Sequence, residues 1–196
     1  MQNTIFSCVY AGSVAYYQTL LNAEHCMIDT GEHFVKSSPR NRCIIASPQG
    51  ELRLSIPLEK GKNHKRNMFD TTICYEHNWQ AIHWKSLCSC YRKSPYFEYY
   101  EDKLAPLIMT KEIFLVDFNL KLQNSILTWL KIDKQILISK EYQSTILKTF
   151  DFRTQKLPAN TLKYRQLFED KIGFLPDVSV LDLLFNQGKE AKSFLM

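Results

Sequence analysis

The hydrophobic pattern of the chain changes its period at Trp79, and this change constrains the fold more than any other feature. Before Trp79, apolar and polar residues alternate, as in "ELRLSIP" (residues 51–57), which is typical of a strand with one buried face. After Trp79, apolar residues recur at helical spacing. The pattern predicts an α/β fold in which a mixed β-sheet from the N-terminal half, residues 1–78, packs against helices that begin at residue 79. An α+β arrangement is the alternative.

The first thirty residues predict a strand, a helix and a second strand. "TIFSCV" (residues 4–9) and "CMID" (residues 26–29) are short apolar runs typical of buried strands. Between them, Ser13 is a candidate helix cap, and the residues that follow it carry a helical apolar pattern. Two strands joined through a helix are expected to be parallel.

A hairpin is the clearest local signal. "RCIIASP" and "ELRLSIP" flank Gln49-Gly50, where the glycine supplies the positive φ that a tight turn needs. "MFDTTICY" (residues 68–75) predicts a further strand.

Two helices are predicted after residue 78. The first has one broad apolar face and ends before Pro95, whose ring breaks the hydrogen-bond ladder. Its face comprises Trp79, Ile82, Leu87, Cys90 and Tyr91. The apolar positions of the second helix are Ile113, Val116, Leu120, Leu127 and Leu130.

The remainder of the chain has a mixed pattern, with Ser179 as the expected cap of a last short helix. We therefore predict one domain over residues 1–196: sheet-rich at 1–78, helical at 79–132, and a mixed C-terminal extension at 133–196.

Composition restricts the partners. A formal net charge of +5 is mildly basic, which favours an anionic small-molecule ligand and falls short of the dense cationic stripe of a nucleic-acid-binding protein. No apolar run approaches the ~18 residues that span a bilayer, so membrane insertion is not expected. The start "MQNTIFSCVYAG" lacks the features of a secretory signal, which predicts a cytoplasmic protein.

Six cysteines are then expected to be free thiols. No CxxC pair occurs, so no metal site is predicted. The sequence also lacks a Gly-rich phosphate loop, HExxH and GxSxG, and it identifies no cofactor.

His83 is the first candidate catalytic residue, because a histidine titrates near cellular pH and can act as general acid or base. A hydrogen-bonded histidine in the core is the alternative. Lys85, Tyr91 and Lys93 follow it within three helical turns. We predict that Arg42, His83, Lys85, Tyr91 and Lys93 line one polar pocket together with His33, with His83, His33 and Tyr91 in catalytic roles.

Arg40, Asn41 and Arg42 precede the hairpin and are candidates for substrate binding. A guanidinium matches the geometry of carboxylate and phosphate, although such an arginine can equally join a loop to a sheet edge. His33 follows the second strand, together with Asp29 and Glu32. In a parallel sheet this is the carboxyl end, where ligands usually gather.

Further candidates have clear structural alternatives. Asp117 and Asn119 interrupt an apolar helical pattern, which favours a buried network beside the site and a role in substrate binding, with a solvent-facing position as the alternative. Tyr17 and Tyr96 are candidates for contact with the substrate, and aromatic residues also pack helices against sheets. Cys43 could be a nucleophile paired with His83, or a residue of a half-buried strand.

Four stretches of the chain, in order, carry a resemblance to a known family. They are "SSPRNRCIIASPQGELRLSIPLEKGK", "NWQAIHWKSLCSCYRKSPYFEYYEDKLAPLI", "FLVDFNLKL" and "YRQLFEDKIGFLPDVSVLDLLFNQG". Together they resemble the WbqC-like protein family of bacteria, over nearly the whole chain. The last stretch is similar to versions of the family from Bacteroides-type bacteria.

The family takes its name from gene clusters for surface polysaccharide (O-antigen). The resemblance implies an enzyme that modifies a sugar nucleotide, or a transferase that moves an acyl or aminoacyl group onto an amino-sugar nucleotide. A non-catalytic binding or accessory protein of such a cluster is the alternative, and no oligomeric state is predicted. The chain departs from the family where relatives often show a Q-Y-F-P stretch: it has "CVYAGSVAYYQ", in which Tyr10 and Tyr17 keep aromatic positions.

Overall fold

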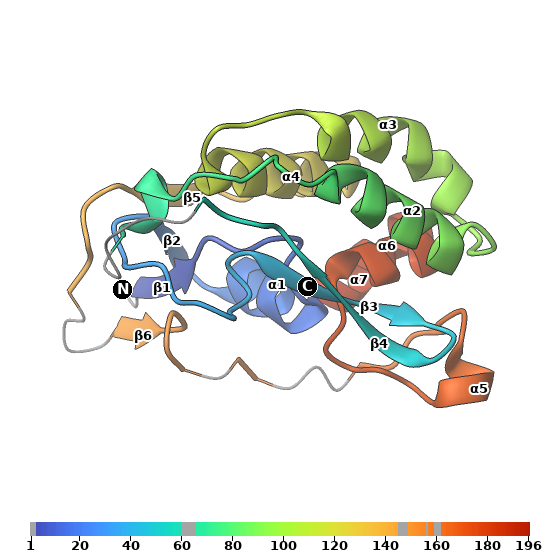
Figure 1. Cartoon of the computed structure of the whole chain (residues 1–196). Helices are drawn as coiled ribbons and strands as arrows, with labels where there is room; N and C mark the ends of the chain where they lie inside the picture. Colours follow the sequence, from blue (N-terminus) through green and yellow to red (C-terminus); the bar gives the residue numbers. More distant parts are fainter. Residues whose placement is uncertain (1–2, 60–65, 145–148, 156, 159–161) are drawn as a thin grey trace.

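The computed structural model describes residues 3–196 except 60–65, 145–148, 156 and 159–161 (Figure 1). Within this part of the chain the strands form a four-stranded parallel sheet and a separate two-stranded hairpin. The strands are β1 (Asn3–Ser7), β2 (His25–Asp29), β3 (Arg42–Ser47), β4 (Gly50–Ser55), β5 (Ile136–Ser139) and β6 (Thr149–Asp151). The predicted α/β class is confirmed.

The parallel sheet has the order β5-β2-β1-β6. From β1 the chain moves outward through β2 to β5, and β6 then pairs on the other side of β1. The strand order therefore reverses between β1 and β6. In open parallel sheets this is the place where ligands bind, outside the carboxyl ends of the strands.

The predicted strand–helix–strand opening is confirmed. β1 and β2 pair in parallel, from Asn3 opposite His25 to Ser7 opposite Asp29. Helix α1 (Val14–Asn22) connects them, and the Ser13 hydroxyl caps it by accepting a hydrogen bond from the backbone N–H of Tyr16. Its apolar face includes Leu20, which is fully buried.

The hairpin β3–β4 is also confirmed, with Gly50 at φ 110° in its turn. It forms its own sheet, and Ile45 and Leu54 on one face are buried in the core. The strand predicted over residues 68–75 is wrong. Met68–Asp70 forms a 3-10 helix (η1), and the residues after it make only isolated bridges, including Thr72 with Phe114.

Three helices lie together on one side of the strands (Figure 1). They are α2 (Trp79–Tyr91), α3 (Phe97–Met109) and α4 (Leu115–Trp129). The start of α2 at Trp79 and its end before Pro95 agree with the sequence pattern. Ile82 was predicted on its buried face and is 61% exposed, so this assignment is wrong. Helix α3 was not predicted, and Ile113 lies before α4 and is exposed.

Strands also occur after residue 78, which corrects the expectation that the sheet comes from residues 1–78 alone. β5 and β6 are edge strands of four and three residues. Such short strands show no measurable period, and β5 exposes Leu137 and Ile138. The remaining elements are α5 (Glu169–Ile172), α6 (Val180–Gln187), the 3-10 helix η2 (Gly188–Glu190) and α7 (Ala191–Leu195). The predicted cap Ser179 is confirmed, since its hydroxyl accepts from the N–H of Leu181.

In the described ranges, no helix combines the length and the apolar character needed to cross a bilayer. The six cysteines are free thiols in the structure. Burial raises the pKa of the Cys8 thiol to about 12 and also raises the pKa of Cys43.

Thiol reactivity should follow this burial. Cys88 is half-buried on α2, whereas the other five cysteines are buried. Because the thiolate is the reacting species, we expect one fast-reacting group in native protein and six in denatured protein. Titration with a coloured disulfide reagent measures both numbers. The variant Cys88→Ser should lose only the fast phase, and a fast phase that persists in this variant would contradict the burial pattern.

Candidate anion-binding site

A cavity of about 630 Å³ lies at the carboxyl edge of the parallel sheet. Its lining includes Ser7 at the end of β1 and Phe152 directly after β6, and it also includes Ile44 of the hairpin. The cavity therefore lies where the strand order reverses, and its size suits a small-molecule ligand.

The loop between β1 and α1 forms one wall and is held by a segment from the far end of the chain. Ser179 donates its backbone N–H to the carbonyl of Ile44 (2.7 Å) and its hydroxyl to the carbonyl of Ala11 (2.7 Å). Val180 donates its N–H to the carbonyl of Gly12 (2.9 Å). One extended segment thus joins the hairpin to the β1–α1 loop and fixes the width of the cavity between them.

Two residues of the lining have an unusual backbone conformation. Ala11 has φ 41° and Ser37 has φ 59°, and both lie in loops that border the cavity. Non-glycine residues in this region cost free energy and persist where surrounding contacts determine them, often at functional sites. Both loops are therefore held in shapes that the local sequence alone would not favour.

A buried ion network supports the base of the cavity. Arg153 pairs with Asp29 at the end of β2 and with Asp151 at the end of β6. Its Nε donates to Asp151 Oδ1 (2.9 Å), and these hydrogen bonds raise the pKa of the guanidinium. Asp29 also accepts the backbone N–H groups of Gly31 and Glu32 (2.8 and 3.1 Å). The last residues of two strands thus orient one arginine.

Arg40 is the second buried arginine of the lining. It forms a two-point ion pair with Glu32, and its Nε donates to Oε1 at 3.0 Å. Burial raises the pKa of the Glu32 carboxyl, and the Arg40 guanidinium opposes that rise. Asn119 on α4 donates to the carbonyl of Arg40 (2.8 Å), and Arg40 Nη2 donates to the carbonyl of Arg153 (3.4 Å). The positive charges of both buried arginines are therefore balanced by buried carboxylates, and their hydrogen bonds fix the two side chains in position.

Arg42 and Arg53 differ from these two. Arg42 and Ile44 are two residues apart on β3 and therefore share a face, and Ile44 pairs with Arg53 of β4. Arg42 and Arg53 thus extend from the same face of the hairpin. Both line the cavity, Arg53 with an exposed side chain and Arg42 half-buried. Neither makes an ion pair with any residue that the structure describes, and the buried Nε of Arg42 has no hydrogen-bond partner there. The cavity therefore has two guanidinium groups available for an anion.

His83 does not line this cavity. It is 3% exposed, and its Nδ1 lies 3.0 Å from the hydroxyl of Tyr10, which does line it. Its ring also packs against Trp79 (centroids 5.0 Å apart). Burial lowers the pKa of His83 to about 4, so the ring is neutral at pH 7 and shares a hydrogen bond with the Tyr10 hydroxyl. In this position it is a core histidine that holds Tyr10.

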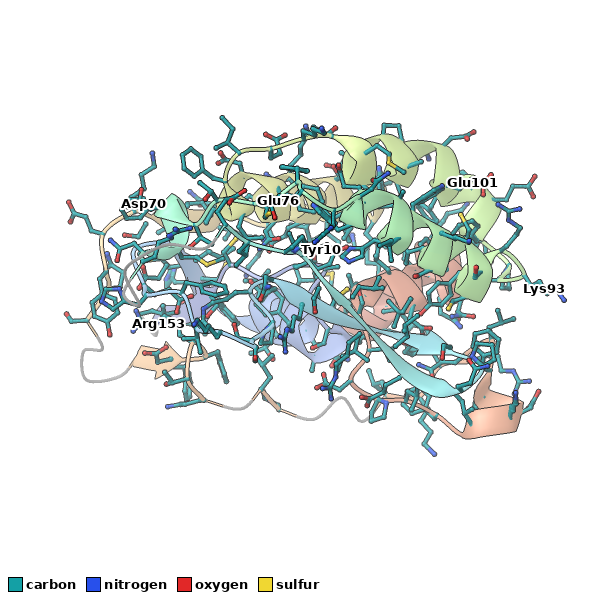
Figure 2. All side chains as sticks on the ribbon, viewed as in Figure 1. Tyr10, Asp70, Glu76, Lys93, Glu101 and Arg153 are labelled. Carbon is teal, nitrogen blue, oxygen red and sulfur yellow. The ribbon has the colours of Figure 1, made fainter. Side chains whose placement is uncertain are left out.

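The other members of the predicted pocket lie elsewhere. Lys85 and Lys93, together with Arg92, border a different pocket, which lies between the end of α2, Pro48 at the hairpin turn and Leu167–Phe168. Lys93 projects at the far end of the molecule from Arg153, with Tyr10 between them in the view of Figure 2. Tyr91 is fully buried, and its hydroxyl accepts the N–H of Ala46 (2.9 Å). The structure does not bring Arg42, His83, Lys85, Tyr91, Lys93 and His33 into one pocket.

The remaining candidates divide between supporting and distant positions. Asn41 is buried and donates to the carbonyl of Ile56 (2.8 Å), which ties the chain before β3 to the end of β4. His33 and Asp117 are exposed outside the cavity lining. Tyr17 is buried on α1, and Tyr96 packs over Gly188, whose position leaves no room for a side chain.

Sequence reasoning missed Arg53, Asp151, Arg153 and Ser179 as site residues. The signal for Arg53 was present in the strand alternation, which places it on the wet face of β4. Asp151 and Arg153 follow a strand of three residues, too short to be recognised. Ser179 was recognised only as a helix cap.

Groups able to act as nucleophiles in the described lining are poorly activated. Burial raises the pKa values of Tyr10, Tyr16 and the thiol of Cys43, all of which border the cavity. Across the described residues, no cluster of three His, Cys, Asp or Glu side chains has the arrangement of a metal site. The described lining thus combines unactivated tyrosine and cysteine side chains with the guanidinium groups of Arg42 and Arg53.

Comparison with known proteins gives two matches. The description "WbqC-like protein family" matches residues 9–159. The chain is 25% identical over 212 residues to "Uncharacterized protein Rv1507c" of Mycobacterium tuberculosis, which covers 92% of this chain and 91% of that protein. No solved structure gives a significant match. The matched family region contains residues 9–13 of the β1–α1 loop, the hairpin and Arg153, and it ends before Ser179.

Proposed function

Because the chain belongs to the WbqC-like protein family, we propose that it binds an anionic small molecule, a nucleotide sugar, in the cavity between the hairpin and the parallel sheet. We further propose that it takes part in the modification of that sugar during surface-polysaccharide synthesis. The observation that carries the proposal is the pair Arg42 and Arg53, which extend from the hairpin without carboxylate partners among the described residues.

The chemistry of the lining supports this ligand class. Guanidinium groups bind phosphate through paired, charge-assisted hydrogen bonds. The apolar side chains Val9, Ile44 and Leu157 line the same cavity and provide surface for a sugar or base ring. The location at the strand-order reversal is the position where nucleotides bind in open parallel sheets.

The proposed reaction class is transfer of an acyl or aminoacyl group to the sugar. In this proposal the protein acts by positioning two bound reactants, because burial raises the pKa of Cys43 and Tyr10 and leaves both protonated at pH 7. Tyr10 is a positioning residue, with its hydroxyl directed by His83.

Removal of the Arg53 guanidinium tests the binding proposal. Arg53→Ala should weaken the binding of UDP-N-acetylglucosamine or dTDP-glucose by about ten- to a hundredfold, because a hydrogen bond to a charged group contributes ~1.5–3 kcal/mol. Isothermal titration calorimetry measures the affinity. Stability should change little, since the side chain is exposed.

Arg92→Ala is the matched control, because Arg92 is an exposed cation on the outer side of the molecule, beyond the cavity lining. The affinity of the Arg92→Ala variant for the same nucleotide sugar should stay within about twofold of the wild-type affinity. Equal binding by wild type, Arg53→Ala and Arg42→Ala would contradict the proposal. So would a wild type that binds neither nucleotide sugars nor free pyrophosphate.

A non-catalytic binding protein is the second candidate. The raised pKa values of Cys43 and Tyr10 favour it, because the described lining then offers no ready nucleophile. Incubation with a nucleotide sugar and an acyl donor separates the two candidates. A mass increase on the sugar identifies a transferase, whereas tight binding without any product supports a binding protein.

A further inference from the structure

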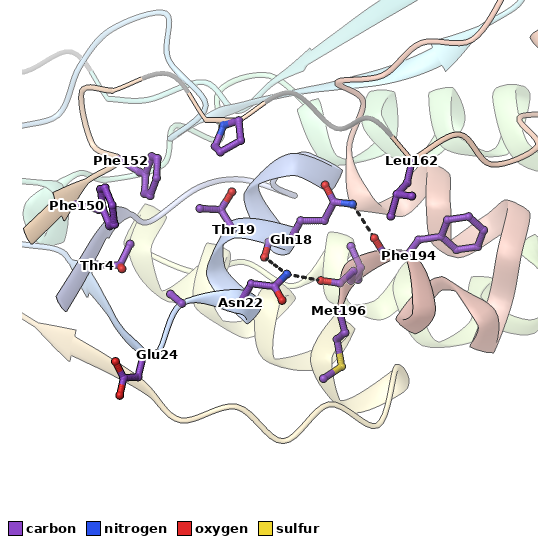
Figure 3. A pocket seen from close by; sticks show the side chains of 13 residues that line it. Thr4, Gln18, Thr19, Asn22, Glu24, Phe150, Phe152, Leu162, Phe194 and Met196 are labelled. Atoms are coloured by element: carbon purple, nitrogen blue, oxygen red, sulfur yellow. Dashed lines mark hydrogen bonds between the residues drawn. The ribbon is translucent and has the colours of Figure 1, made fainter. Parts of the chain in front are cut away.

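An apolar groove of about 570 Å³ lies on the face of the molecule that carries α1 and α7, beside β6 (Figure 3). Phe150 and Phe152 stand at one end of it, and Leu162 and Phe194 stand toward the other. Phe150 is 48% exposed and Met196 is 65% exposed. Large apolar side chains in a groove are a feature of a surface that receives a partner.

Two amide side chains of the groove are already engaged in hydrogen bonds, and Glu24 is an exposed carboxylate in its lining. Gln18 donates to the carbonyl of Phe194 (2.7 Å), and Asn22 donates to the carbonyl of Leu195 (3.2 Å), as the dashed lines in Figure 3 show. These bonds dock α7 onto α1. The groove therefore offers mainly apolar contact to an occupant.

The groove adjoins the arginine-lined cavity. Phe152 and Pro158 belong to the linings of both. The ring of Phe152 is anchored by stacking on Phe6, with ring centroids 5.5 Å apart, so this shared wall has a fixed place in the structure. A ligand that lies against Phe152 can contact both spaces.

We propose that the ligand of the cavity carries an apolar chain, of acyl or alkyl type, that passes Phe152 and continues along the groove. This proposal rests on the proposed function, because it places the anionic group of the same ligand at Arg42 and Arg53. The charge distribution indicates the kind of occupant. Among the described residues, the cavity has two guanidinium groups without ion-pair partners, and the groove is mainly apolar. A soluble anionic amphiphile matches both ends.

A matched pair of probes measures the contribution of the chain. Octyl phosphate and methyl phosphate have the same head group, and octyl phosphate is used below the concentration at which it forms micelles. The wild type should bind octyl phosphate at least about tenfold more tightly, since each buried methylene adds roughly fourfold in affinity. Calorimetry or ligand-observed magnetic resonance gives both affinities.

The double variant Phe150→Ser/Met196→Ser should abolish this gain and leave the affinities for methyl phosphate and UDP-N-acetylglucosamine unchanged. Both side chains are substantially exposed, so the fold should tolerate the changes. Ile82→Ser is the matched control, because Ile82 is 61% exposed on α2, outside the groove, and this variant should keep the full gain.

Equal affinity of the wild type for the two phosphates would overturn the inference, and so would a gain that survives in the double variant. A second copy of the chain is another possible occupant of the groove, and sedimentation analysis detects it. An oligomer that forms with the wild type and is lost in the double variant would overturn the inference. Binding to anionic vesicles that depends on Phe150 would do the same. The proposed function is tested separately, because it fails only when binding of UDP-N-acetylglucosamine is absent or independent of Arg53.

Discussion

Replacement of Arg153 by methionine should lower the free energy of unfolding by about 3–5 kcal/mol, because it leaves Asp29 and Asp151 without their shared cation in a buried site. Asp29 is fully buried at the end of β2. Methionine fills a similar volume but cannot donate a hydrogen bond. In the variant, the two carboxylates would face each other at the carboxyl edge of the sheet without a cation between them. In the wild type, their ion pairs with Arg153 join the ends of β2 and β6.

Denaturant unfolding followed by circular dichroism measures this loss. Arg165→Met is the control, because Arg165 also pairs with acidic residues, Glu169 and Asp170, but on the exposed surface. That variant should unfold like the wild type, since exposed ion pairs contribute little. A change at Arg153 no larger than the change at Arg165 would show that the buried network does not stabilise the sheet.

The parts of the fold that could be predicted are those whose signals are local. The hairpin turn at Gly50 and the helix cap at Ser13 depend on residues within a few positions of each other. The edge strands β5 and β6 depend on pairing with β2 and β1 from the other end of the chain. No period develops over so few residues, and the sequence gives no local sign of such pairing.

The candidate site was only partly predictable for a related reason. Arg40 and Arg42 were recognised because they stand at the start of a clear hairpin, and both line the cavity. His83 and Lys85 were grouped together because they are close in sequence. A helix separates residues two positions apart by about 200°, which sends His83 into the core and Lys85 to the outer face. Nearness in sequence is therefore a poor guide to a shared pocket on a helix.

Asp117 and Asn119 illustrate the same geometry on α4. They were predicted together as members of a network beside the site. The side-chain amide of Asn119 donates a hydrogen bond to the backbone carbonyl of Arg40, whereas Asp117 is exposed. The sequence marks both as interruptions of an apolar pattern, and only the orientation of the helix decides which of them meets the site.

The C-terminal residues beyond the family match should be part of the same cooperative unit as the rest of the chain. The match ends at residue 159, yet Phe185 on α6 is fully buried. Its ring lies 5.0 Å from the ring centroid of Tyr91 and 5.0 Å from that of Phe97. Its backbone carbonyl also accepts the N–H of Tyr96 (3.0 Å), at the turn between α2 and α3. The last helices thus pack into the core formed by α2 and α3.

Phe185→Ala should therefore destabilise the whole protein by about 3–5 kcal/mol, because it removes a buried ring and leaves a cavity between three helices. A loss of this size should lower the midpoint of thermal unfolding by roughly 10 °C, with the single transition retained. Tyr99→Ala is the matched control, since Tyr99 is an aromatic residue of α3 that is 62% exposed, and its removal should cost about 1 kcal/mol or less. Differential scanning calorimetry distinguishes the outcomes. A variant that melts in two steps, with the second step at the wild-type temperature, would show that residues 162–196 fold as a separate unit, and that Ser179 reaches the cavity from an appendage outside the main core.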